Sequence, residues 1–480
     1  MNIMYLSAEV EPFAKSGGLG DVLGALPKAV AKQGCNVSVV MPKYTRLIDS
    51  KYQDEMNYIG YMYVDLSWRH QYCGVFKLEK DGVNYYFLDN EFYFGGDLYC
   101  FADTERFSFF SKACLDLIGY LNQKVDVLHC NDWSTALVPV MLDAFYRHNQ
   151  LYSNIRTVYT IHNLRYQGKT SKEMLQDITG LPDKYFSGYC MEHGGCINMM
   201  KGAIVFSDAV TTVSETYANE IRTSEFGEGL ESLINQYAYK MTGIVNGVDY
   251  NVYNPSKDKL IWQTYSSATV DEKKSENKKQ LQQFLGLPVR EDVPVIGLIS
   301  RLVDQKGLDL VDRVMEDILQ RDVQVVVLGT GEKRYEEMFK YFAGKYPDRM
   351  SANIYFSNQL AHRVYAGSDF VLVPSQFEPC GLTQLIGLKY GALPIVRETG
   401  GLKDTVLSYN EQTGKGNGFS FTNYNAHDML YTINRAVDYW YSHQDIYKQI
   451  RKRGMRCDYS WKESSKKYIE LYSRLTGDNK

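Results

Sequence analysis

The segment NIMYLSAEVEPFAKSGGLGDV (residues 2–22) points to the fold class, because an apolar run is followed by a lysine, paired glycines and an aspartate. An apolar run that ends in glycines predicts a buried strand turning into a helix. Glycines at such a turn let the backbone approach a ligand closely, and the free N–H groups of a helix start favour an anion. The segment therefore suggests a phosphate site. It also fits a strand-to-helix turn that binds nothing, with Lys15 as a solvated loop lysine.

The alternation of strands and helices continues along the chain in two series. Strands spaced by helices predict parallel sheets with right-handed crossovers. Because the series separate near residue 245, we expect an α/β protein with two doubly wound, Rossmann-like domains at 1–245 and 246–455. The charged segment 266–280 is expected to be an exposed loop and helix start. The expected strands are the apolar runs at 2–9, 36–42, 84–89, 125–132, 157–163, 209–214, 243–249, 293–300, 323–331, 353–357, 370–375 and 393–398.

The composition argues against several classes of protein. The 480 residues, 44% hydrophobic and 23% charged, are typical of a soluble globular chain with two or three domains. A net charge of -4 gives no reason to expect nucleic acid or a membrane as partner, and no apolar run reaches the roughly 18 residues of a membrane helix. Nine scattered cysteines without zinc-type spacing indicate reduced thiols in a cytoplasmic protein. The 39 tyrosines fit either sugar-binding faces or a general use of tyrosine in core and surface.

Polar residues follow the predicted strands, at the edge where doubly wound sheets bind their ligands. They are Glu9 with Lys15, Asp132 with Trp133, His162 with Asn163, Asn246 with Gly247, Arg301, Gly329 with Gly331, and Glu378. Two domains with such strand ends suggest a cleft between them that holds one substrate on each side.

Two segments of the second half combine charge with a helix start. ISRLVDQKG (299–307) offers the planar donors of Arg301 and the mobile charge of Lys306, a pair suited to a diphosphate, although a surface salt-bridge loop fits equally well. In PSQFEPCGLTQLIGLKYG (374–391), Glu378 precedes a helix that opens at Gly381. A carboxylate there can accept hydrogen bonds from sugar hydroxyls while the helix end takes phosphate.

Seven segments together resemble one family. They are KSGGLGDV, HCNDW, TIHNLRYQG, TTVSETYANEI, GIVNGVD, ISRLVDQKG and FEPCGLTQLIGLKYGALPIVRETGGLKDTV. Their order and spacing, from residue 2 to about 475, resemble the bacterial glycogen synthase and plant starch synthase family. The resemblance implies a retaining glucosyltransferase with the two-Rossmann GT-B fold, in which the amphipathic segment at 456–480 returns to the first domain as a helix.

The resemblance also implies roles for the donor side. Lys15 and the backbone of Gly17 and Gly18 would face the nucleotide diphosphate, with Asp21 supporting their loop. Arg301 and Lys306 would neutralise the leaving group, and Glu378 would lie near the donor. Cys380, Gly381, Leu382 and Thr383 match backbone contacts to the anion and the sugar.

Three further residues match donor positions of the family. His162 would hold the glucose and its developing positive charge, although a histidine after a strand is often structural. Asn246 resembles an asparagine that contacts the sugar. Phe356 falls where an adenine-stacking aromatic, more often tyrosine, is usual; ordinary core is the alternative.

The acceptor end of the glucan would be bound by Glu9, Asp132, Trp133 and Asn163. The expected partners are ADP-glucose and an α-1,4-glucan or maltooligosaccharide. Ile386 stands where many relatives of this fold have a second glutamate, and no Asp-x-Asp pair occurs, so neither a metal nor another cofactor is expected.

The implied reaction is glucosyl transfer to the non-reducing 4-hydroxyl of the glucan. Retention would proceed by a front-face path, since the motifs offer no obvious carboxylate nucleophile. Two alternatives stay open: a related transferase that uses UDP-glucose, and a glucan-binding protein without activity. A nicotinamide dehydrogenase lacks support, because no G-x-G-x-x-G follows the first strand.

Overall fold

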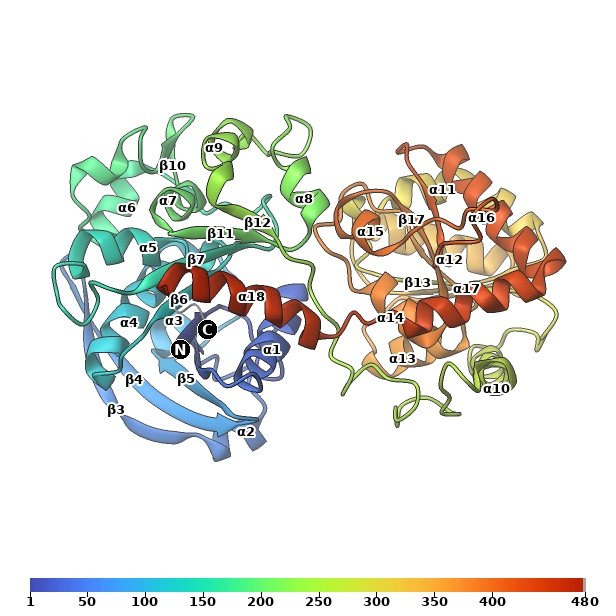
Figure 1. Cartoon of the computed structure of the whole chain (residues 1–480), viewed down its shortest axis with the longest axis horizontal. Helices are drawn as coiled ribbons and strands as arrows, with labels where there is room; N and C mark the ends of the chain where they lie inside the picture. The colour runs from blue at the N-terminus through green and yellow to red at the C-terminus, as the bar shows by residue number, and fades with distance from the viewer. Residues whose placement is uncertain (478–480) are drawn as a thin grey trace. The chain divides into compact units, whose positions relative to one another are not determined.

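The computed structural model describes residues 1–477, which fold as two compact units (Figure 1). The N-terminal unit comprises Met1–Gly247 and the segment that starts at Trp461, and the C-terminal unit comprises Val248–Ser460. The chain thus changes unit within a few residues of positions 245 and 455, where the sequence pattern changes. Each unit is built on a mainly parallel sheet flanked by helices, as the strand and helix alternation predicts.

Within residues 1–477, the N-terminal unit contains a nine-stranded sheet in the order β12-β11-β7-β6-β1-β2-β5-β4-β3. Neighbours from β12 to β5 are parallel, whereas β4 and β3 add an antiparallel hairpin at one edge. The strands are β1 (Asn2–Leu6), β2 (Asn36–Pro42), β3 (Asn57–Leu66), β4 (Arg69–Lys80), β5 (Val83–Asp89), β6 (Val127–Asn131), β7 (Arg156–Ile161), β11 (Ala209–Thr212) and β12 (Met241–Gly243). The sequence prediction missed the hairpin, whose strand β3 is largely exposed at the edge of the sheet.

Helices cover both faces of this sheet (Figure 1). They are α1 (Gly18–Ala31), α2 (Ser50–Glu55), α3 (Glu91–Phe94), α4 (Asp103–Leu121), α5 (Leu137–Met141), α6 (Lys172–Thr179), α7 (Met199–Phe206), α8 (Glu215–Glu220), α9 (Glu231–Gln236) and α18 (Trp461–Thr476). A small antiparallel sheet joins β8 (Lys169–Thr170), β10 (Cys196–Asn198) and β9 (Glu192–His193).

Helix α18 returns to the N-terminal unit and packs against α1. Its Tyr472 hydroxyl lies 2.9 Å from the Tyr5 hydroxyl of β1 and 2.7 Å from Nδ1 of His129 on β6. These buried groups satisfy one another, as polar groups removed from water must. Helix α18 is therefore anchored to the central strands of the sheet.

In the described part of the C-terminal unit, six parallel strands follow the order β15-β14-β13-β16-β17-β18. They are β13 (Val295–Ile299), β14 (Gln324–Leu328), β15 (Met350–Asn353), β16 (Phe370–Val373), β17 (Leu393–Arg397) and β18 (Phe419–Phe421). The helices are α10 (Val270–Phe284), α11 (Leu308–Gln320), α12 (Lys333–Lys345), α13 (Asn358–Gly367), α14 (Thr383–Tyr390), α15 (Gly400–Thr405), α16 (Ala426–Ser442) and α17 (Gln444–Arg456). Strand β15 ends at Asn353, where the prediction expected a strand to begin.

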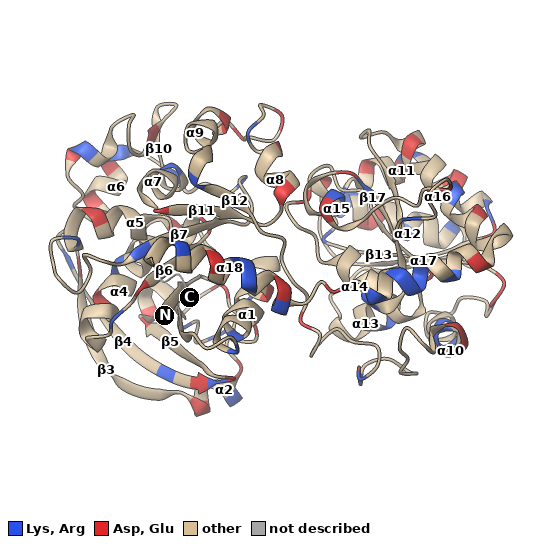
Figure 2. Cartoon of the chain, in the orientation of Figure 1, with Lys and Arg blue, Asp and Glu red and all other residues tan. Residues whose placement is uncertain are grey.

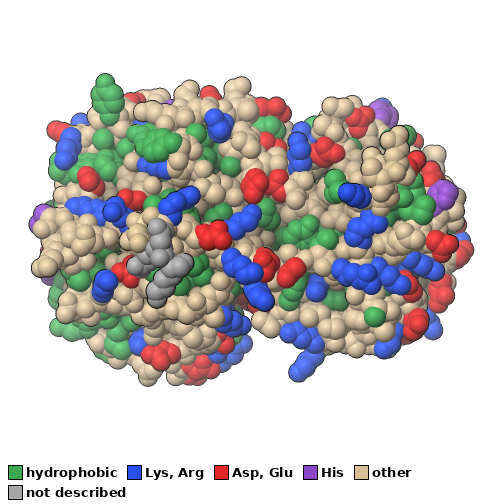
Figure 3. Space-filling view, viewed as in Figure 1, with side chains coloured by type: hydrophobic (Ala, Val, Ile, Leu, Met, Phe, Trp, Pro, Cys, Tyr) green, Lys and Arg blue, Asp and Glu red, His purple; other side chains and the backbone are tan. Residues whose placement is uncertain are grey.

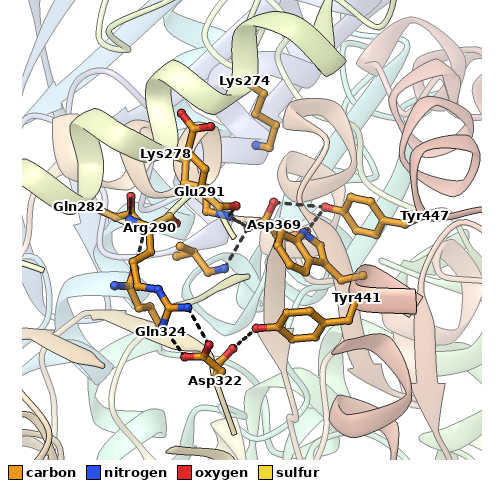
Figure 4. Close-up of polar contacts among 12 residues, drawn as sticks. Lys274, Lys278, Gln282, Arg290, Glu291, Asp322, Gln324, Asp369, Tyr441 and Tyr447 are labelled. Carbon is orange, nitrogen blue, oxygen red and sulfur yellow. Dashed lines mark hydrogen bonds and ion pairs between the residues drawn. The ribbon is translucent and has the colours of Figure 1, made fainter. Parts of the chain in front are cut away.

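The charged segment 266–280 contains the helix start that its composition predicts, but one face of it is buried and not exposed. It forms α10, and Lys274 and Lys278 on its inner face are buried. The Lys278 ammonium pairs with buried Asp369 at 2.9 Å, and Tyr447 donates to the same aspartate (Figure 4). Lys274 donates to the carbonyls of Tyr365, Ala366 and Tyr390, the last residues of α13 and α14. The lysines are tolerated inside because each finds fixed acceptors.

The tyrosines serve both core and surface. Those among the largest fully buried side chains are Tyr5, Tyr44, Tyr85, Tyr159, Tyr185, Tyr390, Tyr447, Tyr468 and Tyr472. Others lie exposed on the β3–β4 hairpin and pair across it, with Tyr61 stacked on Tyr72 and Tyr63 on His70. Cross-strand aromatic pairs stabilise such an edge. The high tyrosine content therefore does not by itself indicate a sugar site.

Charged residues lie mainly on helices and loops, and basic and acidic side chains are interspersed on the face shown (Figures 2 and 3). Among residues 1–477, no helix has both the length and the apolar character that crossing a membrane requires.

Candidate active site

The glycine loop between β1 and α1 is anchored by a buried carboxylate. Glu9 is 3% exposed. Its Oε2 accepts from the backbone N–H of Ser16 at 2.6 Å and of Gly17 at 3.2 Å. Its Oε1 accepts from the Ser16 hydroxyl at 2.9 Å and from the Tyr99 hydroxyl at 2.6 Å. These four bonds use the carboxylate that the sequence analysis assigned to binding the glucan acceptor. The geometry of Glu9 therefore fits a role in holding the loop better than a role in binding the acceptor.

The face of the loop that carries the glycines is open. No heavy atom lies within 4 Å of where a Cβ on Gly17 or Gly18 would sit, and no side chain caps the start of α1. The first N–H groups of this helix are therefore available to an anion. Gly20 differs, because a Cβ there would lie 2.4 Å from Cβ of Lys15. The sequence analysis did not single out Gly20, whose role is to let the loop pack on the helix.

Lys15 lies between two carboxylates, 2.9 Å from Asp21 and 3.1 Å from Glu11. Partial burial alone would lower the pKa of Lys15, but Asp21 and Glu11 outweigh that effect and raise it. The ammonium is thus charged and held at the loop. The predicted support of the loop by Asp21 has this contact as its physical basis.

The ends of β6 and β7 are tied together through Asp132. Its Oδ1 accepts from the backbone N–H of His162 at 2.8 Å and of Asn163 at 3.4 Å. Asp132 has φ 56° and ψ -178°, a backbone conformation that residues other than glycine rarely adopt. Burial raises the pKa of Asp132 to about 7, and the charge of Glu9 adds to this effect. A strained carboxyl near that of Glu9 is the kind of arrangement found at functional sites.

The imidazole of His162 is held by Asn131, the last residue of β6. Its Nε2 lies 3.0 Å from Oδ1 of Asn131, and burial lowers the pKa of His162 to about 3. The ring is therefore neutral near pH 7. Trp133 lies in the turn after Asp132 and packs its ring edge against Phe107.

In the C-terminal unit, the loops after β13 and β16 interlock. The Lys306 ammonium lies 2.6 Å from Oε2 of Glu378, and the Ser375 hydroxyl donates to the same oxygen at 2.8 Å. Gly307 allows this approach, because its φ is 69° and a Cβ would lie 2.0 Å from the Pro374 carbonyl oxygen. Arg301 stands beside the pair in sequence but is exposed.

The segment after Glu378 leads into a helix with a free N-terminus. Gly381 has φ 75°, and Thr383 begins α14 without a side-chain cap. The side chain of Cys380 is buried, so only its backbone is suited to a ligand. The side chain of Leu382 packs against the apolar cluster around Ile386, so here too only the backbone is suited to a ligand.

Glycines of α15 support this segment from behind. A Cβ on Gly400 would lie 2.0 Å from the Glu378 carbonyl oxygen, and the Gly401 N–H donates to that carbonyl at 3.1 Å. The motif RETGGLKDTV thus acts by close backbone packing, which the sequence analysis did not assign.

Two further donor residues were predicted, one in each unit. Phe356 follows β15, two strands from β13, and is 84% exposed, which excludes the core role left open for it. Asn246 belongs to the N-terminal unit and is 6% exposed. Its Oδ1 has no hydrogen-bond partner among residues 1–477, so a donor from outside would satisfy it.

Two family models match the chain. Residues 2–236 match the starch synthase catalytic domain, and residues 280–453 match glycosyl transferases group 1.

Similar proteins match over nearly the whole length. Glycogen synthases of Clostridium novyi and Bacillus cereus are each 51% identical and cover 99% of this chain, which in turn covers 99% and 100% of theirs. The catalytic domain of starch synthase IV from Arabidopsis thaliana, bound to ADP and acarbose, superposes with a TM-score of 0.92 at 32% identity over 99% of each chain. A sucrose-phosphate synthase from Thermosynechococcus elongatus, 16% identical with a TM-score of 0.63 and covering all of both chains, shares the fold.

Proposed function

Because the chain belongs to the bacterial glycogen synthase and plant starch synthase family of GT-B glycosyltransferases, we propose that it transfers glucose from ADP-glucose to the non-reducing 4-hydroxyl of an α-1,4-glucan, with retention of configuration. The observation that carries this proposal in the structure is the Lys306–Glu378 pair beside the free N-terminus of α14. It places cation, carboxylate and anion-binding backbone at one end of the sheet.

The leaving diphosphate is the group that these residues would stabilise. Arg301 and Lys306 supply positive charge, and the N–H groups at Gly381, Leu382 and Thr383 supply donors. Charge builds on the phosphate oxygen as the glycosidic bond breaks, and fixed donors stabilise it most at that point. In this proposal Lys306 contacts both Glu378 and the diphosphate.

The N-terminal unit would supply the remaining contacts to the donor. Lys15 and the backbone N–H of Gly18 would bind the diphosphate, with Gly17 beside them; Asp21 and Glu9, which accepts from the Gly17 N–H, would hold the loop. The unpartnered Oδ1 of Asn246 would accept a sugar hydroxyl. The exception is Phe356 of the C-terminal unit, which would stack on adenine from its exposed position.

The glucan acceptor would lie near Asp132, Trp133 and Asn163. Trp133 offers a flat face for a sugar ring, and the second carboxyl oxygen of Asp132 an acceptor for a hydroxyl. Glu9 would contribute by positioning, given its four internal bonds. The catalytic domain of starch synthase IV from Arabidopsis thaliana was solved bound to ADP and acarbose, which supports this proposal.

Retention would follow a front-face path. The acceptor 4-hydroxyl attacks C1 on the face from which the diphosphate departs. The C1–O bond to phosphate breaks, the new C1–O4 bond forms, and the hydroxyl proton passes to the departing phosphate oxygen. Neutral His162 suits this path, because an imidazolium would repel the positive charge that develops on the sugar.

We place the reaction in the cytoplasm. The nine cysteines, all within residues 1–477, form no disulfide, which matches a reducing compartment.

The test is release of nucleoside diphosphate from ADP-glucose and, separately, UDP-glucose, with and without glycogen. Glycogen-dependent ADP release that collapses in Lys306→Ala is the expected result. UDP release alone would leave the fold assignment unchanged and identify UDP-glucose as the donor. Glycogen binding without turnover of either donor would overturn the proposal in favour of a binding protein.

A further inference from the structure

Asn131 makes three side-chain contacts at the end of β6, where it is 1% exposed. Its Nδ2 donates to the carbonyl of Leu6 at 3.1 Å and to the carbonyl of His129 at 3.2 Å. Its Oδ1 lies 3.0 Å from Nε2 of His162. One amide therefore connects β1, β6 and the residue that follows β7.

These contacts determine which nitrogen of His162 carries the proton. A carbonyl oxygen only accepts, so the two carbonyls take both hydrogens of the Asn131 amide. Its Oδ1 can then only accept, and Nε2 of His162 must donate. A neutral imidazole carries one proton, so Nδ1 is left with a free lone pair. Within residues 1–477 no hydrogen-bond partner of Nδ1 is recorded.

We propose that Asn131 is a positioning residue that fixes His162 as the Nε2–H tautomer and so presents Nδ1 as an acceptor for a hydroxyl of the donor glucose. The second half of this inference rests on the proposed function; the tautomer does not. Asn131 acts through His162 and does not touch the substrate.

Other groups near His162 support the same state. Asp132 accepts from the backbone N–H of His162, and the neighbouring His129 is fully buried with both ring nitrogens hydrogen-bonded. The carboxylate of Asp132 is thus engaged by the backbone, which leaves Asn131 as the partner of the ring. An aspartate at 131 would reverse this arrangement, because it cannot donate to two carbonyls and would favour an imidazolium.

The first experiment measures the tautomer directly. Protein labelled with 15N in its eight histidines is examined by long-range 1H–15N NMR, and His162→Gln assigns the signal. We expect His162 of the wild type to show a protonated Nε2 and an unprotonated Nδ1 at neutral pH. A protonated Nδ1, or an imidazolium, would overturn the proposal without bearing on the activity.

The second experiment measures the consequence. Asn131→Asp is expected to lower kcat about 10- to 100-fold, as loss of a partner that orients a functional histidine does, and to add an acidic limb to the pH profile. Thr135→Val is the matched control, because Thr135 bonds only the backbone of Asn131 and the neighbouring turn. An unchanged pH profile in Asn131→Asp would contradict the positioning role. If this variant does not fold, the wild-type spectrum still decides the tautomer.

The third experiment tests the hydroxyl. In Lys306→Ala, which we expect to bind donor without turnover, ADP-glucose should shift the Nδ1 signal of His162 whereas ADP alone should not. Equal shifts with both ligands, or no shift at saturating ADP-glucose, would overturn the contact. Absence of transfer by the wild type would instead count against the proposed function and leave the tautomer result standing.

Discussion

The loop that carries Lys15 in the N-terminal unit is held by a buried carboxylate, whereas the loop that carries Arg301 in the C-terminal unit leaves that side chain exposed. All four hydrogen bonds of the Glu9 carboxylate are to groups of the protein itself. By contrast, Phe356 of the C-terminal unit is 84% exposed. Preorganised groups contribute to folding and function together, while exposed groups contribute when a ligand arrives. The Lys306–Glu378 pair lies between these extremes, because Glu378 is buried and Lys306 is half-buried.

The contrast between the two loops is tested most directly at Arg301. We expect Arg301→Ala to lower kcat/KM about 10³-fold, as removal of a donor to a developing anion does, without changing the unfolding temperature. Initial rates of ADP release and thermal unfolding measure both effects. Arg313→Ala, an exposed arginine on α11, is the control. A clear loss of stability in Arg301→Ala would show that the exposed side chain of Arg301 also stabilises the folded protein.

Glu9→Gln should affect activity and stability together. The amide oxygen of glutamine can still accept from the backbone N–H groups of Ser16 and Gly17, but its NH₂ group then faces the hydroxyls of Ser16 and Tyr99, which lose the oxygen to which they donate. We expect about a 10²-fold loss of kcat/KM and a loss of about 1–3 kcal/mol in the free energy of unfolding. Steady-state rates and denaturant unfolding measure these losses.

Glu11→Gln is the matched control for this change, because Glu11 is more exposed and its side chain pairs with Lys15. Equal losses in both variants would mean that the charge around Lys15 matters and the buried anchor does not.

The pH dependence of stability should arise partly in the N-terminal unit. Burial lowers the pKa of both His129 and His162 from 6.5 to about 3. The unfolded chain therefore binds more protons between these values, and stability is present above about pH 6.5 and lost as pH falls toward 3. Each histidine contributes up to about 1.4 kcal/mol per pH unit.

His129→Gln should remove one of these contributions, which denaturant unfolding at several pH values would measure. A variant with the wild-type slope would show that His129 is charged in the folded state.

The smallest expected effect concerns Phe356. Phe356→Leu removes a flat ring but keeps an apolar side chain, so we expect the KM for ADP-glucose to rise about five-fold, close to the lower limit for a base stack. Phe356→Tyr should match the wild type. Tyr355→Leu, at the neighbouring and half-exposed residue, is the control. An unchanged KM in Phe356→Leu would place the adenine elsewhere.

Much of the fold was predictable because it depends on local pattern. The runs that became β1, β6 and β13 are apolar, bounded by turns and separated by helices, and such runs form parallel strands wherever they occur. The hairpin of β3 and β4 was missed for the opposite reason. It lies at an edge, and the pairing that stabilises it joins residues on two strands.

The residues of the candidate site likewise divide into those that a local pattern predicts and those that depend on tertiary contacts. Arg301, Lys306 and Glu378 were visible because strand ends carry ligands in this class of fold. Asn131 and Tyr99 were not, since each bonds a residue that is distant in the sequence. Ser375 was not, since nothing in its motif marks it as the partner of Glu378. Nothing in the sequence distinguishes a tyrosine that holds Glu9 from one that fills a core.

By itself, the sequence determined most of the parallel strands and which chemical groups stand at the strand ends, but not the hairpin of β3 and β4 or the position of β15. What it determined depends on hydrophobic period, turn residues and chain order. Only the tertiary structure decided that Glu9 anchors a loop, that Lys274 and Lys278 are buried on a helix rich in charge, and which nitrogen of His162 is protonated. Such properties depend on hydrogen-bond partners and on exclusion of water, and both arise only when distant parts of the chain are packed together.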